Sequence, residues 1–330
     1  MCSGHTGVEV FLSTLYLWLF TSLLAPFLPA DRVRIAEAGR LVQDLGDRLW
    51  PGQARTPMPV LLIRDSAEFL VGRDAGGEDF TATGDSLRGH GIWTRPRHFP
   101  PTLVATFPVG GVPTIVVGTP ERTGLPSTRW VLTLLHEHFH QWQYSQPWYY
   151  PGVARLGLSG GDSTGMWMLN YPFPYDSLPV GAAVRRLALS LRSALDPESG
   201  SGLQPVLRAR EALRSQLSAA DYRYLEFQLW QEGVARYVEY RAANLASSRK
   251  HTGDFVGLPD YQPYSAAAAD RGRGLLQELE ETDLQRNRRV SFYPIGAAIA
   301  LLLDRTGKEW KEAYSRRPFA LAALLARPSD

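Results

Sequence analysis

Cysteine and lysine are scarce in this sequence. Cys2 is the only cysteine among 330 residues, so no internal disulfide can form and the body of the chain has no thiolate for a metal site or a nucleophile. Lysine occurs only at Lys250, Lys308 and Lys311. The net charge of +2 gives no broad electrostatic case for binding nucleic acid or acidic partners. We therefore expect no nucleic acid among the partners.

Charge is nearly absent from one stretch close to the N-terminus. Residues 8–29 carry a single charged side chain, near their start. This segment is either a secretory signal with Ala30 at the cleavage site or an uncleaved membrane anchor, since its length nearly matches a bilayer. No Lys or Arg precedes it, which weakens the signal-peptide interpretation, and Arg32 and Arg34 after it favour the opposite orientation. We expect residues 1–30 to be this segment and the protein to be extracytoplasmic, either secreted or anchored in a membrane.

Residues 31–126 are predicted to form a lobe built mainly of β-strands. The expected elements are an amphipathic helix at 31–50, a strand at 58–63, loops around short strands at 65–101, and a hairpin with strands at 103–107 and 114–117. Gly110-Gly111 is a good two-residue turn for this hairpin. Pro108 and Pro113 cannot donate to a ladder, so we expect one side of the hairpin to face a sheet edge or the turn.

Residues 127–330 are predicted to form a mainly helical lobe. The expected helices cover 127–144, 179–195, 203–218, 220–247, 294–305 and 308–326. Ser127 is expected to cap the first of them. Segments 147–178 and 249–272 are rich in proline, glycine or polar residues and are expected to be loops. Together the two lobes predict one α+β domain over residues 31–330.

Three of the seven histidines fall within the segment His136-Glu137-His138-Phe139-His140. Residues four apart lie on one face of a helix, so His136 and His140 can direct their imidazoles at one ion. Zn²⁺ accepts such nitrogens and needs one more protein ligand and an open position for water. Glu137 can flank the ion without ligating it and take a proton from that water, whose pKa the ion lowers toward about 7. The pattern therefore predicts a zinc site.

The neighbouring residues favour a metal over a chance match. Val131, Leu134 and Phe139 help to make this helix apolar on most sides. Burying two histidines and a glutamate in such a helix is costly unless they have partners, and a metal supplies them. His138 points away from the other two histidines and is not expected to be a ligand.

The third ligand is expected to be acidic, and Asp162 and Glu232 are the candidates. Glu232 lies in a long helical pattern that can hold it rigidly, and Gly233 beside it permits close approach to the helix that carries the histidines. Asp162 lies in a Gly-rich loop and is more typical of a turn residue. Glu239 lies two turns beyond Glu232 and is either a carboxylate that orients His136 or His140 or a surface residue. We predict Glu232 as the ligand.

These residues resemble the gluzincin metallopeptidases, the group that includes thermolysin and the zinc aminopeptidases. That family carries H-E-x-x-H on one helix and a glutamate ligand on a later one. Glu232-Gly233-Val234-Ala235 is similar to the E-G-x-A stretch around that glutamate, and Tyr293-Pro294-Ile295-Gly296 is similar to a Y-x-x-G stretch whose tyrosine stabilises the oxyanion. The resemblance implies a zincin-like fold. The spacing departs from the family: about ninety residues separate His140 from Glu232 instead of some twenty, which implies inserted helices or a distant branch.

The expected function is zinc-dependent hydrolysis of a peptide or protein substrate. The expected roles are zinc ligation by His136, His140 and Glu232, general-base catalysis by Glu137 and oxyanion stabilisation by Tyr293. By analogy with gluzincins, the strand at 114–117 is expected to pair with an extended substrate. The aromatic loop at 166–175 is either a wall for apolar side chains or core packing.

Two alternative functions stay open from the sequence. One is a zinc hydrolase acting on a non-peptide bond, which the sequence does not separate from a peptidase. The other is a catalytically silent, membrane-anchored interaction module with a structural metal. The presence of Glu137 argues against the silent module, because a purely structural site needs no base.

Overall fold

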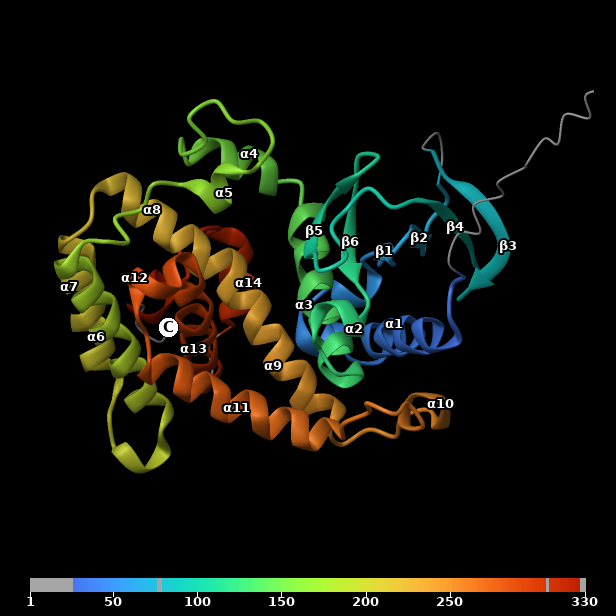
Figure 1. Ribbon diagram of the computed structural model, residues 1–330. Coiled ribbons are helices and arrows are strands. Elements are labelled where there is room, and N and C mark those ends of the chain that lie inside the picture. The colour runs from blue at the N-terminus through green and yellow to red at the C-terminus, as the bar shows by residue number, and fades with distance from the viewer. Residues whose placement is uncertain (1–25, 76–78, 307–308, 327–330) are drawn as a thin grey trace, which may run out of the picture.

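The computed structural model describes residues 26–75, 79–306 and 309–326. The chain is a mixed α/β protein, with a six-stranded mixed sheet on one side and helices on the other (Figure 1). The strands are β1 (Val60–Ile63), β2 (Ala67–Val71), β3 (Thr81–Leu87), β4 (His90–Pro96), β5 (Val104–Val109) and β6 (Val112–Gly118). The helices are α1 (Pro29–Leu49), α2 (Pro120–Thr123), α3 (Ser127–Ser145), α4 (Tyr149–Arg155), α5 (Trp167–Asn170), α6 (Leu178–Leu195), α7 (Leu203–Ser215), α8 (Ala219–Gln228), α9 (Val234–Ala246), α10 (Gly253–Val256), α11 (Tyr264–Glu280), α12 (Leu284–Asn287), α13 (Phe292–Arg305) and α14 (Trp310–Arg316). Shorter helical turns are η1 (Gln53–Arg55), η2 (Pro197–Ser199), η3 (Leu229–Gly233), η4 (Arg288–Ser291) and η5 (Ala322–Ala326).

The strands follow the order β3-β4-β2-β1-β6-β5, and β1 pairs with β6 in parallel while the other neighbours are antiparallel. The predicted hairpin is confirmed: β5 and β6 pair from Val104 opposite Val117 to Val109 opposite Val112. Pro108 lies on β5, at the edge of the sheet, as predicted. The strand at 114–117, which was expected to pair with an extended substrate, is not at the edge of the sheet. It belongs to β6, whose hydrogen-bonding groups are used by β1 on one side and β5 on the other.

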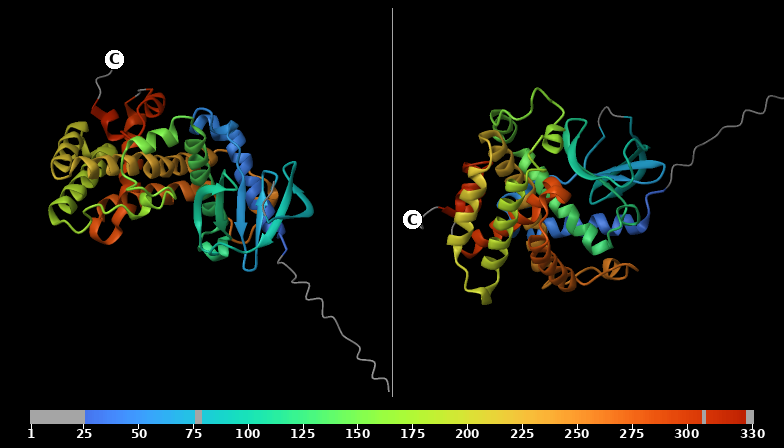
Figure 2. Two further views of the ribbon diagram at one scale, coloured as in Figure 1. Left: turned by 90° about the horizontal axis from the view of Figure 1, so that it is seen from above. Right: turned by 60° about the vertical axis from the view of Figure 1, so that its left-hand side comes forward.

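Helices α1 and α3 lie against one face of the sheet, and α3 runs between the sheet and the other helices (Figure 2). Successive strand residues point to opposite faces, so β1 contributes to two cores. Leu62 belongs to the main core, which also contains Leu135 of α3 and continues into the helical lobe. Leu61 belongs to a smaller core on the other face, where Phe99 and Phe107 pack. The rigid middle layer formed by α3 carries the histidines.

Most predicted helices are confirmed, but several details of the helical lobe are wrong. The predicted loop at 147–178 contains α4 and α5, and the predicted helix at 308–326 is interrupted between α14 and η5. Ser127 is not a cap: Pro126 precedes the helix, and the Ser127 hydroxyl donates a hydrogen bond of 2.6 Å to Asp260. The predicted loop at 249–272 contains the start of α11 at Tyr264. Four consecutive alanines follow there, and alanine has the strongest intrinsic preference for a helix. The polar residues around them made the segment resemble a loop.

The predicted signal or anchor at 1–30 falls mainly outside the described residues. Helix α1 begins at Pro29, so the last residues of that segment already belong to the folded domain. Phe27 packs on Phe69 of β2 with ring centroids 5.4 Å apart. Within the described part of the chain, no helix is long and apolar enough to cross a membrane.

Candidate metal centre

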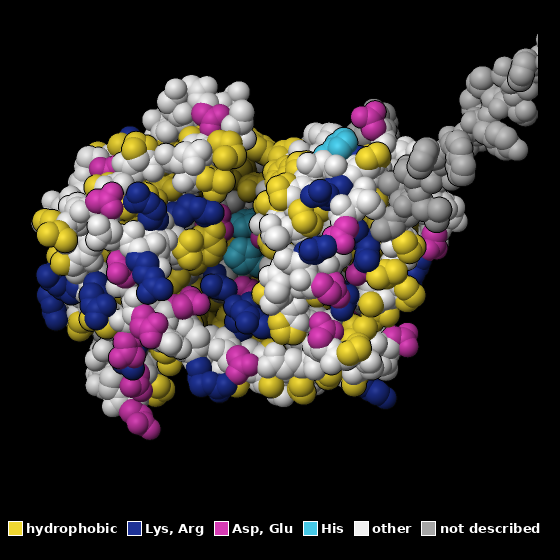
Figure 3. Space-filling model, viewed as in Figure 1, with side chains coloured by type: hydrophobic (Ala, Val, Ile, Leu, Met, Phe, Trp, Pro, Cys, Tyr) yellow, Lys and Arg dark blue, Asp and Glu magenta, His cyan; other side chains and the backbone are white. Residues whose placement is uncertain are grey.

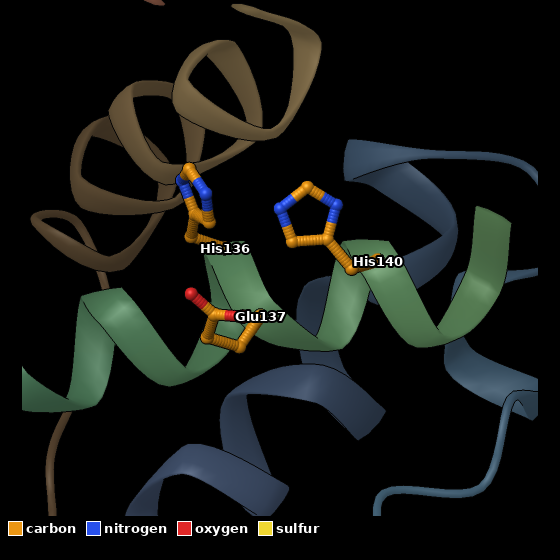
Figure 4. Close-up of side chains that lie close together, drawn as sticks. All are labelled: His136, Glu137 and His140. Carbon is orange, nitrogen blue, oxygen red and sulfur yellow. The ribbon is translucent and has the colours of Figure 1, made fainter. Parts of the chain in front are cut away.

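The two lobes border a hollow in which histidine side chains are visible (Figure 3). His136, Glu137 and His140 come from the middle of α3 and are all buried. Both imidazoles rise from the same side of the helix, with the Glu137 carboxylate beside them (Figure 4). One potential ligand atom from each of the three residues lies within 4.8 Å of the other two. The four-residue spacing therefore has the geometric effect that the sequence predicted.

Glu232 approaches the two histidines from the opposite helix. Its Oε2 lies 3.5 Å from Nε2 of His140 and 3.8 Å from Nε2 of His136. Tetrahedral zinc with bonds of about 2.0–2.2 Å separates its ligand atoms by roughly 3.3–3.5 Å. The observed separations are close to that value, so two imidazole nitrogens and one carboxylate oxygen fit a zinc ion. Asp162, the other acidic candidate, accepts hydrogen bonds within its own turn, from the backbone nitrogens of Thr164 and Trp167.

A π-helical turn places Glu232. The sequence predicted one continuous helix over 220–247, but η3 interrupts it between α8 and α9. Such turns are rare and are frequent at functional sites. The expected reason for Gly233 is wrong: a Cβ built on Gly233 would lie 2.4 Å from Cα of Gly296. Gly233 therefore permits close packing against α13, which carries Tyr293, and not against α3.

Each imidazole is also held through its other ring nitrogen. Nδ1 of His136 lies 3.7 Å from Oε2 of Glu239. Nδ1 of His140 lies 2.7 Å from the amide oxygen of Gln143, which only accepts, and 3.2 Å from the amide nitrogen of Gln231, and the shorter contact favours the proton on Nδ1. The lone pair of His140 Nε2 is then free to face Glu232. Partners at the second ring nitrogen, such as Glu239 and Gln143, orient metal-binding histidines.

Two arginines balance the charge of Glu239. It forms ion pairs with Arg271 and, at 3.4 Å, with Arg236, and its side chain is 3% exposed. Burial alone would raise the pKa of Glu239, but Arg271 and His136 hold it well below its usual range. This carboxylate therefore stays charged next to His136. This position agrees with the interpretation that Glu239 orients a histidine. It does not agree with the alternative that Glu239 is a surface residue.

The charges of the site create a strong preference for a cation. Burial by itself would lower the pKa of His136, yet Glu232 and Glu239 beside its ring nitrogens raise it to about 9. Burial would raise the pKa of Glu232, but His140 and His136 hold it well below its usual range. Buried carboxylates thus draw positive charge onto the imidazole of His136. The same arrangement favours a divalent cation between the two imidazoles.

Glu137 and Tyr293 lie beside this donor set. Thr106 of β5 donates a 2.8 Å hydrogen bond to Oε2 of Glu137. The ring of Tyr293 is stacked on that of His136 at a centroid distance of 6.4 Å, and its hydroxyl accepts a 2.7 Å hydrogen bond from Arg289. Burial and the charge of Glu232 raise the pKa of Tyr293 well above its ordinary value, so the hydroxyl keeps its proton.

Two other sequence-based interpretations concern residues outside the centre. His138 is fully buried on another side of α3, and its Nε2 lies 3.0 Å from the Thr56 carbonyl oxygen, to which it donates. Burial lowers the pKa of His138 to about 4. The aromatic residues of the 166–175 loop are mostly core: Trp167 packs on Phe227 with centroids 5.2 Å apart.

No protein family model, no curated protein and no solved structure matches this chain. The site therefore has to be interpreted from its own geometry.

Several residues of the site were not predicted from the sequence. Gln143 follows His140 by three residues and Arg289 precedes Tyr293 by four, so helical spacing alone contained a signal for both. Arg271 had no such signal, because its segment was predicted to be a loop. Thr106 reaches Glu137 only through the packing of β5 on α3, which no local pattern contains.

Proposed function

We propose that this protein is a zinc-dependent hydrolase that cleaves peptide bonds. The observation that carries the proposal is the convergence of His136 Nε2, His140 Nε2 and Glu232 Oε2, at 3.5 and 3.8 Å between the carboxylate oxygen and the two nitrogens. Two histidines and one glutamate form the ligand set of thermolysin-like catalytic zinc sites. The order of the motif, the later glutamate and Tyr293 along the chain supports a zincin-like, gluzincin-type enzyme.

The residues around the donor set supply the remaining chemistry. Zinc, when bound, activates a water molecule and polarises the carbonyl of the substrate. Glu137 accepts the proton of the attacking water and returns it to the leaving amine. Thr106 fixes one oxygen of Glu137 by donating to Oε2. Tyr293, with its hydroxyl protonated and held by Arg289, donates to the oxyanion that develops on the substrate.

The edge of the sheet supports a peptide as the substrate. β5 is the terminal strand, and in Figure 1 it is the strand nearest the helical lobe. Because Thr106 of β5 contacts Glu137, this edge, which pairs with no further strand in the described part of the chain, borders the site. An extended peptide can add to such an edge through main-chain hydrogen bonds. We therefore assign the pairing with an extended substrate to β5 and not to the strand at 114–117.

Elemental analysis and a peptide-cleavage assay test the proposal. We expect one zinc per chain in the wild type, a sharp loss of zinc in His140→Ala, and normal zinc in His90→Ala, which removes an exposed histidine of β4 as a control. Glu137→Gln should keep zinc and lose about 10²–10⁴-fold in turnover of a peptide library. A folded wild type without zinc, or Glu137→Gln activity within a few-fold of the wild type, would contradict the proposal.

A further inference from the structure

A second cavity lies beside the metal centre. It has a volume of about 200 Å³ and is enclosed by the first turn of α3, by α9 and α11, and by one residue of α13. Three arginines line it: Arg129, Arg236 and Arg271. We refer to it as the arginine pocket. Figure 3 shows basic side chains in the hollow close to the histidines.

The arginine pocket adjoins the catalytic residues. Arg129 precedes His136 by seven residues, which is about two turns, so both lie on the same face of α3. Arg236 and Arg271 both pair with Glu239, whose Oε2 lies 3.7 Å from Nδ1 of His136. A substrate that runs from the metal centre along α3 toward Arg129 therefore reaches this pocket.

The pocket holds hydrogen-bond donors without partners. The buried Nε of Arg271 has no hydrogen-bond partner among the residues that the structure describes. The side chain of Arg129 is exposed, and it forms no ion pair or hydrogen bond with the residues that the structure describes. Burial lowers the pKa of Arg271; the charge of Glu239 opposes this effect, and the charges of Arg236 and Arg129 add to it. Mutual repulsion between these guanidinium groups favours an added negative charge.

The acidic residues in and beside the pocket balance the charges of Arg236 and Arg271 but form no ion pair with Arg129 among the described residues. Asp270 accepts from Gln262 at 2.7 Å and also pairs with Arg273 outside the pocket. Glu278 pairs with Arg236 at 3.5 Å. Glu239 is shared between Arg236, Arg271 and His136. Each carboxylate thus has cationic or amide partners of its own, and the donors of Arg129 and the Nε of Arg271 stay available.

We propose that the arginine pocket binds a carboxylate of the substrate, so that the enzyme prefers peptides with an acidic group near the scissile bond. The guanidinium group matches a carboxylate with parallel hydrogen bonds, and a cavity of about 200 Å³ accommodates a carboxylate with its side chain. The inference rests on the proposed peptidase function. The carboxylate comes from an Asp or Glu side chain or from the C-terminus of the peptide.

Matched peptides and one substitution test the proposal. The substrates are fluorogenic heptapeptides in which Asp is moved one position at a time, the same peptides with Asn, and a neutral peptide with either a free or an amidated C-terminus. Arg129→Gln is the test variant, because this exposed residue is outside the core. Arg186→Gln changes another exposed arginine, on α6, and removes the same charge elsewhere.

We expect kcat/KM to be about tenfold higher for one Asp position, or for the free C-terminus, and this preference to vanish in Arg129→Gln but persist in Arg186→Gln. A preference for one Asp position would identify a side-chain carboxylate as the bound group. A preference for the free C-terminus would identify the C-terminal carboxylate. Equal kcat/KM for all pairs in the wild type would overturn the pocket and leave the peptidase function intact.

Binding separates the two hypotheses if no peptide is cleaved. Fluorescence polarisation with the same peptides, labelled, is measured on the zinc-loaded Glu137→Gln protein and on Glu137→Gln combined with Arg129→Gln. Tighter binding of an acidic peptide that requires Arg129 would support the pocket while the wild type's inactivity contradicts the hydrolase. Binding that does not depend on Arg129 would overturn the pocket.

Discussion

The substitution Gly233→Ala provides a sharp test of how the fold positions the proposed zinc ligand. Gly233 follows Glu232 in the π-helical turn and faces Gly296 of α13. A Cβ added at Gly233 would lie 2.4 Å from Cα of Gly296, whereas ordinary contact between carbon atoms is about 3.5–4.0 Å. The neighbour is backbone, so no side chain can rotate away. The two helices would have to separate by roughly 1 Å.

The expected cost combines two opposing effects. Overpacking a well-packed interior costs about 1–3 kcal/mol, and contact with backbone belongs at the upper end of that range. Replacing glycine by alanine in a helix returns about 1 kcal/mol of intrinsic preference. The net loss of unfolding free energy is then about 2 kcal/mol. In domains of 150–250 residues this lowers Tm by about 4–8 °C, and the lower end applies to this larger chain.

Thermal unfolding and zinc affinity measure the two consequences of Gly233→Ala. We expect the lower Tm together with weaker zinc binding, because separating the helices moves Glu232 away from His136 and His140. Gly181→Ala is the control: this glycine of α6 has no atom within 4 Å of a built Cβ, so the Tm should stay the same or rise. A Gly233→Ala protein with wild-type Tm and zinc affinity would refute the reasoning.

Two further predictions concern buried charges. Glu239→Gln should weaken zinc binding about 10–100-fold in a chelator competition, because it removes the partner of His136 Nδ1 and leaves the charge of Arg271 uncompensated. Glu278→Gln is the control: Glu278 contacts Arg236 but not His136, so its substitution should leave zinc affinity unchanged. Burial lowers the pKa of His138 from 6.5 to about 4. Below pH 6.5 the unfolded chain therefore binds a proton at His138 that the folded chain does not bind. The unfolding free energy from urea titrations should therefore fall between pH 6.5 and 4, and fall less in His138→Gln; equal pH dependence of the two proteins would contradict this.

The parts of the fold that the sequence predicted are those with local signals. The hairpin of β5 and β6 has two runs of β-branched residues around Gly110-Gly111, and the helix that carries the histidines has an unbroken apolar pattern. The four-residue spacing of His136 and His140 placed both on one face for the same reason. Each of these features depends on neighbours only a few residues away.

The remaining features depend on packing between distant segments. The strand at 114–117 is not open to an extended substrate as predicted, because β1 pairs with β6, and this pairing joins residues more than fifty positions apart. The π-helical turn at η3 has no pattern of its own, and it accompanies the contact of Gly233 with Gly296. Arg271 and Thr106 reach the site only when α11 and β5 pack around α3. No window of neighbouring residues contains such information.

The long separation between His140 and Glu232 is consistent with a single compact site. Helices α4 to α8 lie between the two residues in the sequence, but α9 still packs directly on α3. Loop closure grows only with the logarithm of length, at about 0.6 kcal/mol per doubling. Extending a connection from some twenty to about ninety residues therefore costs about 1 kcal/mol, which is small beside the burial of α6 and α8 side chains in the main core. The intervening helices thus stabilise the lobe that holds Glu232, and the unusual spacing is no argument against the proposed ligand set.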